Sequence, residues 1–149
     1  MTRRGDVAFI VNDEIDIALA LKAEGVHLGQ DDFPIAMARS LLGKDAVIGQ
    51  STHTLDQALR AVSEGANYIG FGPIFETQTK ISGNPPVGIE AIAQIRKQVG
   101  LPIYAIGGIK LSQAQAILAA GATGVAVASA LAGASKETIQ EWIAGLDPS

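Results

Sequence analysis

The sequence contains no cysteine and few aromatic residues, and both absences narrow the classes of protein it can encode. Without cysteine it has no disulfides, no thiolate metal ligands and no cysteine nucleophile, which is typical of a cytoplasmic protein. Aromatic residues make up 5% of the chain and hydrophobic residues 48%, so the core must be built from aliphatic side chains. Such a core suits a parallel sheet that is covered by helices.

Long apolar runs and charge of one sign are also absent. No stretch approaches the about 20 apolar residues that a membrane-spanning helix needs, and the charged start of the chain lacks the long apolar region of a signal peptide. The formal net charge is -4 with both signs interspersed, so no basic stripe could follow a nucleic-acid backbone. We therefore predict a cytoplasmic protein with neither a membrane nor a nucleic acid as partner.

Short apolar runs alternate along the chain with segments of helical spacing. The runs predict buried strands at residues 7–11, 26–28, 46–48, 68–71, 103–106 and 125–128. Six strand-helix units follow, without a linker or composition shift that would divide residues 1–149 into more than one domain. An intact TIM (β/α) barrel needs eight such units and typically 200 or more residues. We predict an α/β protein, an incomplete barrel with about six of its eight units.

Glycine stands before three of the predicted strands or close to their start. Gly25, Gly65 and Gly121 each follow a helical segment. Because glycine enters the left-handed conformation without a steric penalty, we expect all three to terminate helices.

Two aspartates follow neighbouring predicted strands. Asp13 comes after the first strand and Asp32 after the second. Parallel strands lie about 4.8 Å apart, so both carboxylates could reach one hard cation such as Mg²⁺. Capping of the helices that follow is the alternative, because Asp13 precedes a helical segment from Ile15 and Asp32 precedes Pro34.

Candidate phosphate-binding groups follow the later strands. The loop after the fourth strand carries two hydroxyls and an ammonium group, on Thr77, Thr79 and Lys80, which could clamp a diphosphate or could belong to an ordinary solvated loop. Gly108, in the Gly107–Gly108 pair, and Ser129 follow the fifth and sixth strands, a frequent phosphate site in barrels. A tight turn needed for packing is the competing explanation of the glycines.

Three further residues have simpler explanations. His27 lies in an apolar strand and is predicted to be a packed, hydrogen-bonded residue rather than a catalyst. His53 could face a substrate or cap the helix near Leu55, and we assign it no catalytic role. Trp142 is predicted to be a packing anchor of the last helix.

Taken in order, several segments closely resemble the thiamine phosphate synthase family. The matching segments are residues 9–13, 25–32, 49–53, 72–80, 85–88 and 105–109. The resemblance implies a phosphate-binding barrel and a transferase of thiamine biosynthesis, which joins a hydroxymethylpyrimidine diphosphate to a hydroxyethylthiazole phosphate and releases diphosphate. A related thiazole tautomerase shares the barrel and is the closest enzymatic alternative.

The same resemblance implies a role for each candidate residue. Asp13 and Asp32 would hold Mg²⁺, and Lys80 and Ser51 would be the catalytic side chains. The pyrimidine diphosphate would be bound by Asn12, Ser51, Thr79 and Lys80, and the thiazole phosphate would be bordered by Thr77, Gly108, Ala128 and Ser129. Because a stabilised pyrimidine cation forms when diphosphate leaves, no protein nucleophile is needed.

One expected feature of the family has no counterpart in this sequence. The resemblance implies a first strand and, at the end of the second, a segment with glutamine, arginine and lysine that binds the diphosphate; neither is found before Val7. We therefore expect activity to need a complementing N-terminal chain or another subunit, and exposed sheet edges make a homo-oligomer an open possibility. A catalytically silent barrel fragment is the alternative of a different class.

Overall fold

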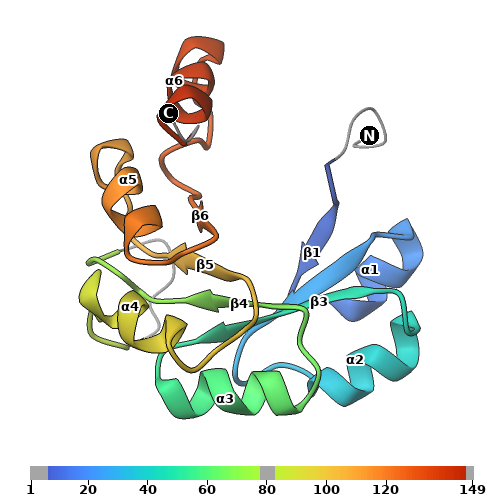
Figure 1. Cartoon of the computed structure of the whole chain (residues 1–149). Helices are drawn as coiled ribbons and strands as arrows, with labels where there is room; N and C mark the ends of the chain where they lie inside the picture. Colours follow the sequence, from blue (N-terminus) through green and yellow to red (C-terminus); the bar gives the residue numbers. More distant parts are fainter. Residues whose placement is uncertain (1–6, 78–82, 147–149) are drawn as a thin grey trace. The chain divides into compact units, whose positions relative to one another are not determined.

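The computed structural model describes residues 7–77 and 83–146, in which six strands alternate with six helices (Figure 1). The α/β fold class and the six strand-helix units predicted from sequence are confirmed. The elements are β1 (Ile10–Asn12), α1 (Ile15–Leu21), β2 (Gly25–Leu28), α2 (Ile35–Leu42), β3 (Val47–Thr52), α3 (Leu55–Ser63), β4 (Tyr68–Phe71), α4 (Glu90–Arg96), β5 (Ile103–Ile106), α5 (Leu111–Ala119), β6 (Gly124–Ala126) and α6 (Lys136–Leu146).

The strands hydrogen-bond in chain order, from β1 to β6. β1 pairs with β2, β2 with β3 and β5 with β6, all in parallel. Asn12 lies opposite His27, and His27 lies opposite Gly49. This register aligns the carboxyl ends of the first three strands, where the candidate residues were expected. The chain divides into two compact units, unit 1 (Met1–Ile69) and unit 2 (Gly70–Ser149), and a single domain over 1–149 stays a prediction.

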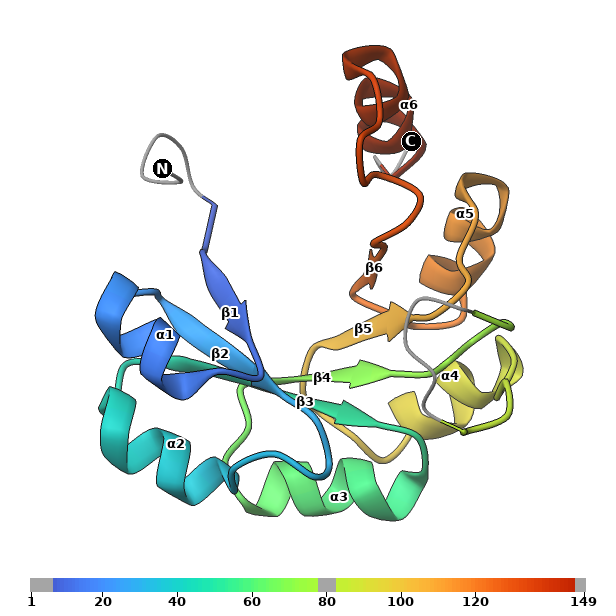
Figure 2. The same cartoon turned by 180° about the vertical axis from the view of Figure 1, so that it is seen from behind.

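Unit 1 packs its helices against β1, β2 and β3. Both views show α1 and α2 on the same side of these strands (Figures 1 and 2), and each helix contacts the strand on either side of it in the chain. Apart from Thr52, the fully buried side chains are aliphatic, as the composition predicts; they include Ala18, Val26, Leu28, Ala38, Ile48 and Ala58. Removal of these surfaces from water is the main stabilising contribution of the unit.

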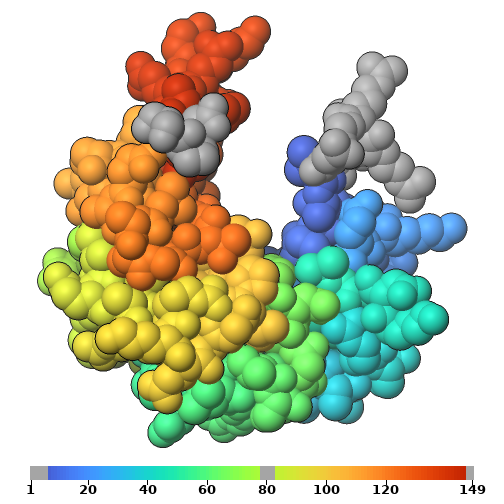
Figure 3. Space-filling model, in the orientation of Figure 1, coloured from blue at the N-terminus to red at the C-terminus, as the bar shows by residue number. Residues whose placement is uncertain are grey.

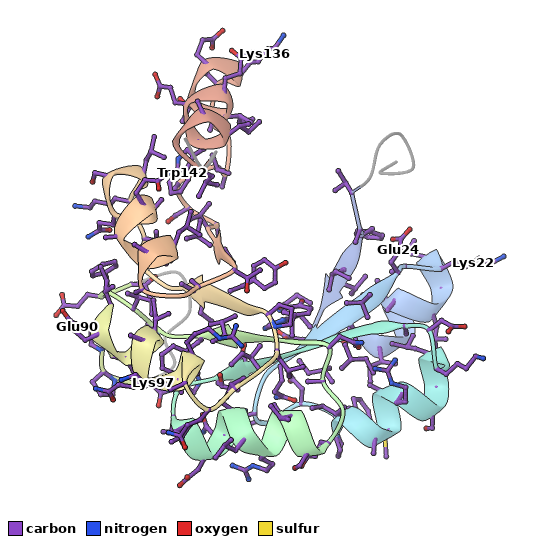
Figure 4. The ribbon with its side chains drawn as sticks, in the orientation of Figure 1. Lys22, Glu24, Glu90, Lys97, Lys136 and Trp142 are labelled. Atoms are coloured by element: carbon purple, nitrogen blue, oxygen red, sulfur yellow. The ribbon has the colours of Figure 1, made fainter. Side chains whose placement is uncertain are left out.

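Unit 2 has its own largely aliphatic core, and its last two helices, α5 and α6, pack against each other. Buried side chains come from β4, β5 and the helices after them, among them Phe71, Ile74, Ile92, Ile103 and Ile117. The space-filling view shows α6, in red, next to the orange segment that includes α5 (Figure 3). Trp142, only 6% exposed, lies on the part of α6 nearer α5 and Lys136 on the part farther away (Figure 4). The prediction that Trp142 is a packing anchor is confirmed.

The start of α6 is capped by local polar groups. Ser135 Oγ accepts the backbone N–H of Thr138 at 3.2 Å. Hydrogen bonds from the backbone N–H of Glu137 and from the Ser135 side chain lower the pKa of the Glu137 carboxyl, against a smaller opposing effect of burial. α6 therefore begins just after Ser135, at Lys136.

Three predicted strand boundaries are wrong by two residues or more. β1 starts at Ile10 rather than Val7, whose side chain is 65% exposed. β3 continues to Thr52, because pairing with β2 extends to Gln50, so Ser51 lies in the strand and not after it. β6 ends at Ala126, since the Ala128 carbonyl accepts the N–H groups of two later residues and turns the chain.

Gly25 does not terminate α1 as predicted. Lys22 takes the left-handed conformation there, with φ 51°, whereas Gly65 and Gly121 have the expected positive φ. Gly25 is needed for a different reason: a Cβ at this position would lie 1.8 Å from the Val47 carbonyl oxygen in β3. Glycine is required at position 25 because the backbones of β2 and β3 approach closely there, and not because it terminates a helix.

No helix in residues 7–77 and 83–146 is both long enough and apolar enough to cross a membrane. The cytoplasmic location stays a prediction.

Candidate functional site

The end of β1 places Asn12 and Asp13 at a sharp turn. Asp13 has φ +65°, a left-handed conformation that aspartate tolerates better than most residues. Its backbone N–H donates to the His27 carbonyl at 2.8 Å, and the Glu14 N–H donates to the Asn12 carbonyl at 2.8 Å. The Asp13 Oδ1 atom is shielded from solvent. The two backbone hydrogen bonds hold Asp13 in the turn at the carboxyl end of β1.

The loop after β2 is organised by Asp32 and two glutamines. Asp32 Oδ2 accepts the Gly29 N–H at 2.6 Å. Gln30 Nε2 donates to the Ser51 carbonyl at 2.6 Å, and the buried Gln50 donates to the Gly29 carbonyl at 2.7 Å. These bonds hold the loop against the end of β3 and present the exposed Asp32 beside it.

The capping alternatives for these residues are not supported. The N-cap residue of α1 is Glu14 and that of α2 is Pro34, so neither Asp13 nor Asp32 occupies a cap. At α3 the cap is Thr54, whose side chain accepts the Gln57 N–H, and His53 instead donates its backbone N–H to the Gln57 side chain at 2.7 Å. Neither aspartate is therefore the N-cap of the helix that follows it.

Ser51 lies within reach of a histidine on the neighbouring strand. Its Oγ is 2.9 Å from His27 Nε2, and His27 Nδ1 is 3.0 Å from the Tyr68 hydroxyl at the start of β4. All three side chains are half-buried. The predicted packed, hydrogen-bonded state of His27 is confirmed. Its contact with Ser51 was missed, because it depends on the register that pairs β2 with β3.

Unit 1 therefore gathers four of the predicted site residues at the ends of three adjacent strands: Asn12, Asp13, Asp32 and Ser51. Carboxylate oxygens from neighbouring strands are ligands suited to Mg²⁺, which commonly binds one or two carboxylates and takes its remaining ligands from water and phosphate. Within the described part of the chain no group of three or more histidines and acidic residues could hold a metal. The donor set fits a two-carboxylate site, and such a site stays a prediction.

Unit 2 brings Gly108 against the loop that leads to Thr77. The Ile74 N–H donates to the Ile106 carbonyl at 2.8 Å, and the Phe75 N–H donates to the Gly107 carbonyl at 3.1 Å. A Cβ on Gly108 would lie 2.3 Å from the Glu76 carbonyl oxygen. The packing explanation of the glycines is therefore correct, and it leaves their phosphate-binding role as a prediction.

The remaining predicted residues lie in an exposed turn or outside the described residues. Ala128 and Ser129 are exposed in the turn after β6. Thr79 and Lys80 lie outside the described residues, so their predicted contacts stay predictions. Sequence reasoning assigned no role to Gln30, Gln50 or Tyr68; a buried glutamine inside an apolar strand was the one signal that could have indicated them.

The fold and the site residues together define a parallel α/β protein with acidic and hydroxyl side chains at the carboxyl ends of its strands. The chain belongs to the thiamine monophosphate synthase family, whose model matches residues 1–131. A thiamine-phosphate synthase from Chloroflexus aurantiacus is 49% identical over 93% of this chain and 63% of its own length. Another, from Roseiflexus sp., is 48% identical over 90% of this chain and 57% of its own length.

A solved structure agrees with this assignment. Thiamine phosphate pyrophosphorylase from Pyrococcus furiosus superposes with a TM-score of 0.88 at 37% identity, over 97% of this chain and 70% of that chain. The chain spans about three fifths of the length of the curated relatives it matches.

Proposed function

We propose that this chain carries out the thiamine phosphate synthase reaction. A 4-amino-2-methyl-5-hydroxymethylpyrimidine diphosphate is coupled to 4-methyl-5-hydroxyethylthiazole phosphate, giving thiamine phosphate and diphosphate. The observation that carries the proposal is the match to the family model over residues 1–131, which includes Asp13, Asp32 and Ser51 at the strand ends.

Unit 1 would bind the pyrimidine diphosphate. Asp13 and Asp32 would hold Mg²⁺, which supplies positive charge to neutralise the diphosphate. Asn12 and Ser51 would donate hydrogen bonds to the substrate, and hydrogen bonds to an ionised group are about twice as strong as neutral ones. The position of Ser51 within β3, rather than in a loop, supports a fixed geometry for this contact.

The later loops would bind the rest of the substrates. Thr79 and Lys80 would grip the diphosphate, and Thr77, Gly108, Ala128 and Ser129 would border the thiazole phosphate. The small residues in this second set suit close approach of an anion to backbone N–H groups. This is the phosphate-binding form of the barrel that the family resemblance implies.

The chemistry needs positioning and charge more than a nucleophile. The carbon–oxygen bond to diphosphate breaks with its electron pair going to the leaving oxygen, and the amino group of the pyrimidine stabilises the cation left behind. The thiazole nitrogen then forms the new carbon–nitrogen bond. Lys80 and the hydroxyl of Ser51 would stabilise the charge that develops on the leaving oxygen.

Further cations would come from outside the residues described. We propose that a complementing N-terminal polypeptide, or a second subunit, supplies the arginine and lysine contacts expected for the diphosphate. Among the strands of the described residues, β1 comes first in the hydrogen-bonded order, so a strand from the added segment could pair beside it.

A coupling assay tests the proposal. The purified chain is incubated with both substrates and Mg²⁺, alone and with the region of the Chloroflexus aurantiacus relative that precedes the matched part, and thiamine phosphate is measured by mass spectrometry. We expect product, with a fall of about 10-fold to 100-fold for Ser51→Ala, since a hydrogen bond to a charged group contributes about 1.5–3 kcal/mol. Ser63→Ala, on the exposed side of α3, is the matched control.

Two results would count against the proposal. One is the absence of product in both mixtures, and the other is equal activity of the Ser51→Ala and Ser63→Ala variants. Aromatised thiazole phosphate without any coupled product would favour the tautomerase alternative instead.

A further inference from the structure

Both ring nitrogens of His27 are engaged by side chains from neighbouring strands. Nδ1 is 3.0 Å from the Tyr68 hydroxyl and Nε2 is 2.9 Å from Ser51 Oγ. The two rings lie 5.4 Å apart between centroids with an interplanar angle of 31°. A half-buried histidine held at both nitrogens has a fixed ring orientation, so it can impose a direction on each hydrogen bond.

Gly49 makes this arrangement possible. It is the residue opposite His27 in the β2–β3 register. A Cβ at Gly49 would lie 2.1 Å from Tyr68 Cζ and 2.6 Å from His27 Nδ1. Any other residue at this position would therefore push the tyrosine and the histidine apart. Glycine at this position of β3 thus leaves the space that the Tyr68 and His27 rings occupy.

His27 also supports the neighbouring carboxylate. Its backbone carbonyl accepts the Asp13 N–H at 2.8 Å, while its ring contacts Ser51. His27 thus contacts both Asp13 and Ser51, which the proposed function assigns to the metal and to the pyrimidine diphosphate.

The direction of the Ser51 hydrogen bond follows from the protonation of the ring. In a neutral imidazole one nitrogen donates and the other accepts. If Nδ1 carried the hydrogen, Nε2 would accept the Ser51 proton and turn it away from a bound ligand. If Nε2 carries the hydrogen, it donates to Ser51 Oγ and leaves the Ser51 O–H to donate elsewhere.

We infer that Tyr68 and His27 are positioning residues that fix Ser51 as a hydrogen-bond donor toward an anionic ligand. The Tyr68 hydroxyl donates to Nδ1, the Nε2–H donates to Ser51 Oγ, and the Ser51 O–H points to the diphosphate. The inference rests on the proposed function for the identity of the anion. The hydrogen-bond chain itself rests on the two distances from His27 to Tyr68 and Ser51 in the structure.

The protonation state can be measured directly, because the sequence has only two histidines. Histidine labelled with ¹⁵N gives two ring systems in a long-range ¹H–¹⁵N spectrum, and a His53→Asn variant assigns them. We expect His27 to carry its hydrogen on Nε2 with Nδ1 unprotonated. In Tyr68→Phe the hydroxyl that holds this state is gone, so signals of the other tautomer should appear. Tyr104→Phe, which removes the only other tyrosine hydroxyl, is the matched control.

Ligand binding provides the second readout. Diphosphate is titrated in the presence of Mg²⁺, and we expect Tyr68→Phe to weaken binding about fivefold, as for one neutral hydrogen bond. The same substitution should have no further effect in a Ser51→Ala background. His27→Gln, whose amide N–H₂ can replace the Nε2–H donor, should bind more tightly than His27→Leu.

An Nδ1–H tautomer or a doubly protonated ring would overturn the inference. So would a Tyr68→Phe variant that keeps both the wild-type spectrum and the wild-type affinity. If the spectra and affinities agree with expectation but the wild-type chain forms no thiamine phosphate with the added N-terminal region, the proposed function fails while the positioning role stands.

Discussion

The two units hold the ends of their strands by different means. In unit 1 the strand ends are tied by side chains: Gln30, Gln50 and the His27–Ser51 pair link β2 or its loop to β3, while Asp32 holds the Gly29 N–H within the loop after β2. In unit 2 the loop after β4 is tied to the end of β5 by backbone hydrogen bonds, with glycine at the contact.

This difference matches the ligands proposed for each unit. A site built from carboxylates and hydroxyls can bind a cation and donate to a diphosphate, whereas a site built from glycine and small residues exposes backbone N–H groups to an anion. The contacts proposed for Asn12, Asp13, Asp32 and Ser51 in unit 1 would therefore be made by side chains, whereas those proposed for Gly108 and Ala128 in unit 2 would be made by the main chain.

The largest loss of stability is expected for a substitution of Gly25 in unit 1. Gly25→Ala places a Cβ 1.8 Å from the Val47 carbonyl oxygen, and backbone on both sides leaves little room for relaxation. We expect a loss of about 3 kcal/mol or more in the free energy of unfolding, measured by urea denaturation. Gly100→Ala in unit 2, with nothing within 4 Å, is the control and should be close to neutral. Equal stability of the two variants would contradict the close-approach explanation.

A smaller effect is expected for the two arginines that donate hydrogen bonds to loop carbonyls, one in each unit. Arg39 donates to the Ala46 and Lys44 carbonyls and to the Asn67 side chain, whereas Arg96 donates to the Val99 and Leu101 carbonyls.

Substitution by methionine keeps much of the apolar stem and removes these bonds. We expect Arg39→Met to lower the free energy of unfolding by about 2 kcal/mol and Arg96→Met by about 1 kcal/mol, because the former loses more bonds. Urea denaturation of both variants measures the difference. The reverse order would contradict the larger contribution assigned to the Arg39 hydrogen bonds.

Much of the fold could be predicted from the alternation of apolar runs with helical spacing. The boundaries of β4 and β5 agree with prediction to the residue, because both are short apolar runs with clear breaks. β3 was predicted too short because Gln50 and Ser51 are polar, yet pairing with β2 keeps both in the strand.

The candidate site could be predicted in part for a similar reason. Asp13 and Asp32 are acidic residues in the segments that follow the first two apolar runs, and both segments leave the same end of the sheet because β1 and β2 pair in parallel. The His27–Ser51 contact and the role of Gly49 depend on which residues lie opposite one another. Sequence spacing does not determine that register, so it could not have revealed them.

The central claim is that the strand ends of unit 1 bind a diphosphate with Mg²⁺ through carboxylates, and Asp13→Asn tests it most directly. Asparagine accepts the same left-handed backbone, so the substitution removes the charge and keeps the turn. Calorimetric titration of diphosphate with Mg²⁺ should show at least about tenfold weaker binding, about 1.4 kcal/mol, than for the exposed control Asp45→Asn. Equal affinity of the two variants would contradict the claim.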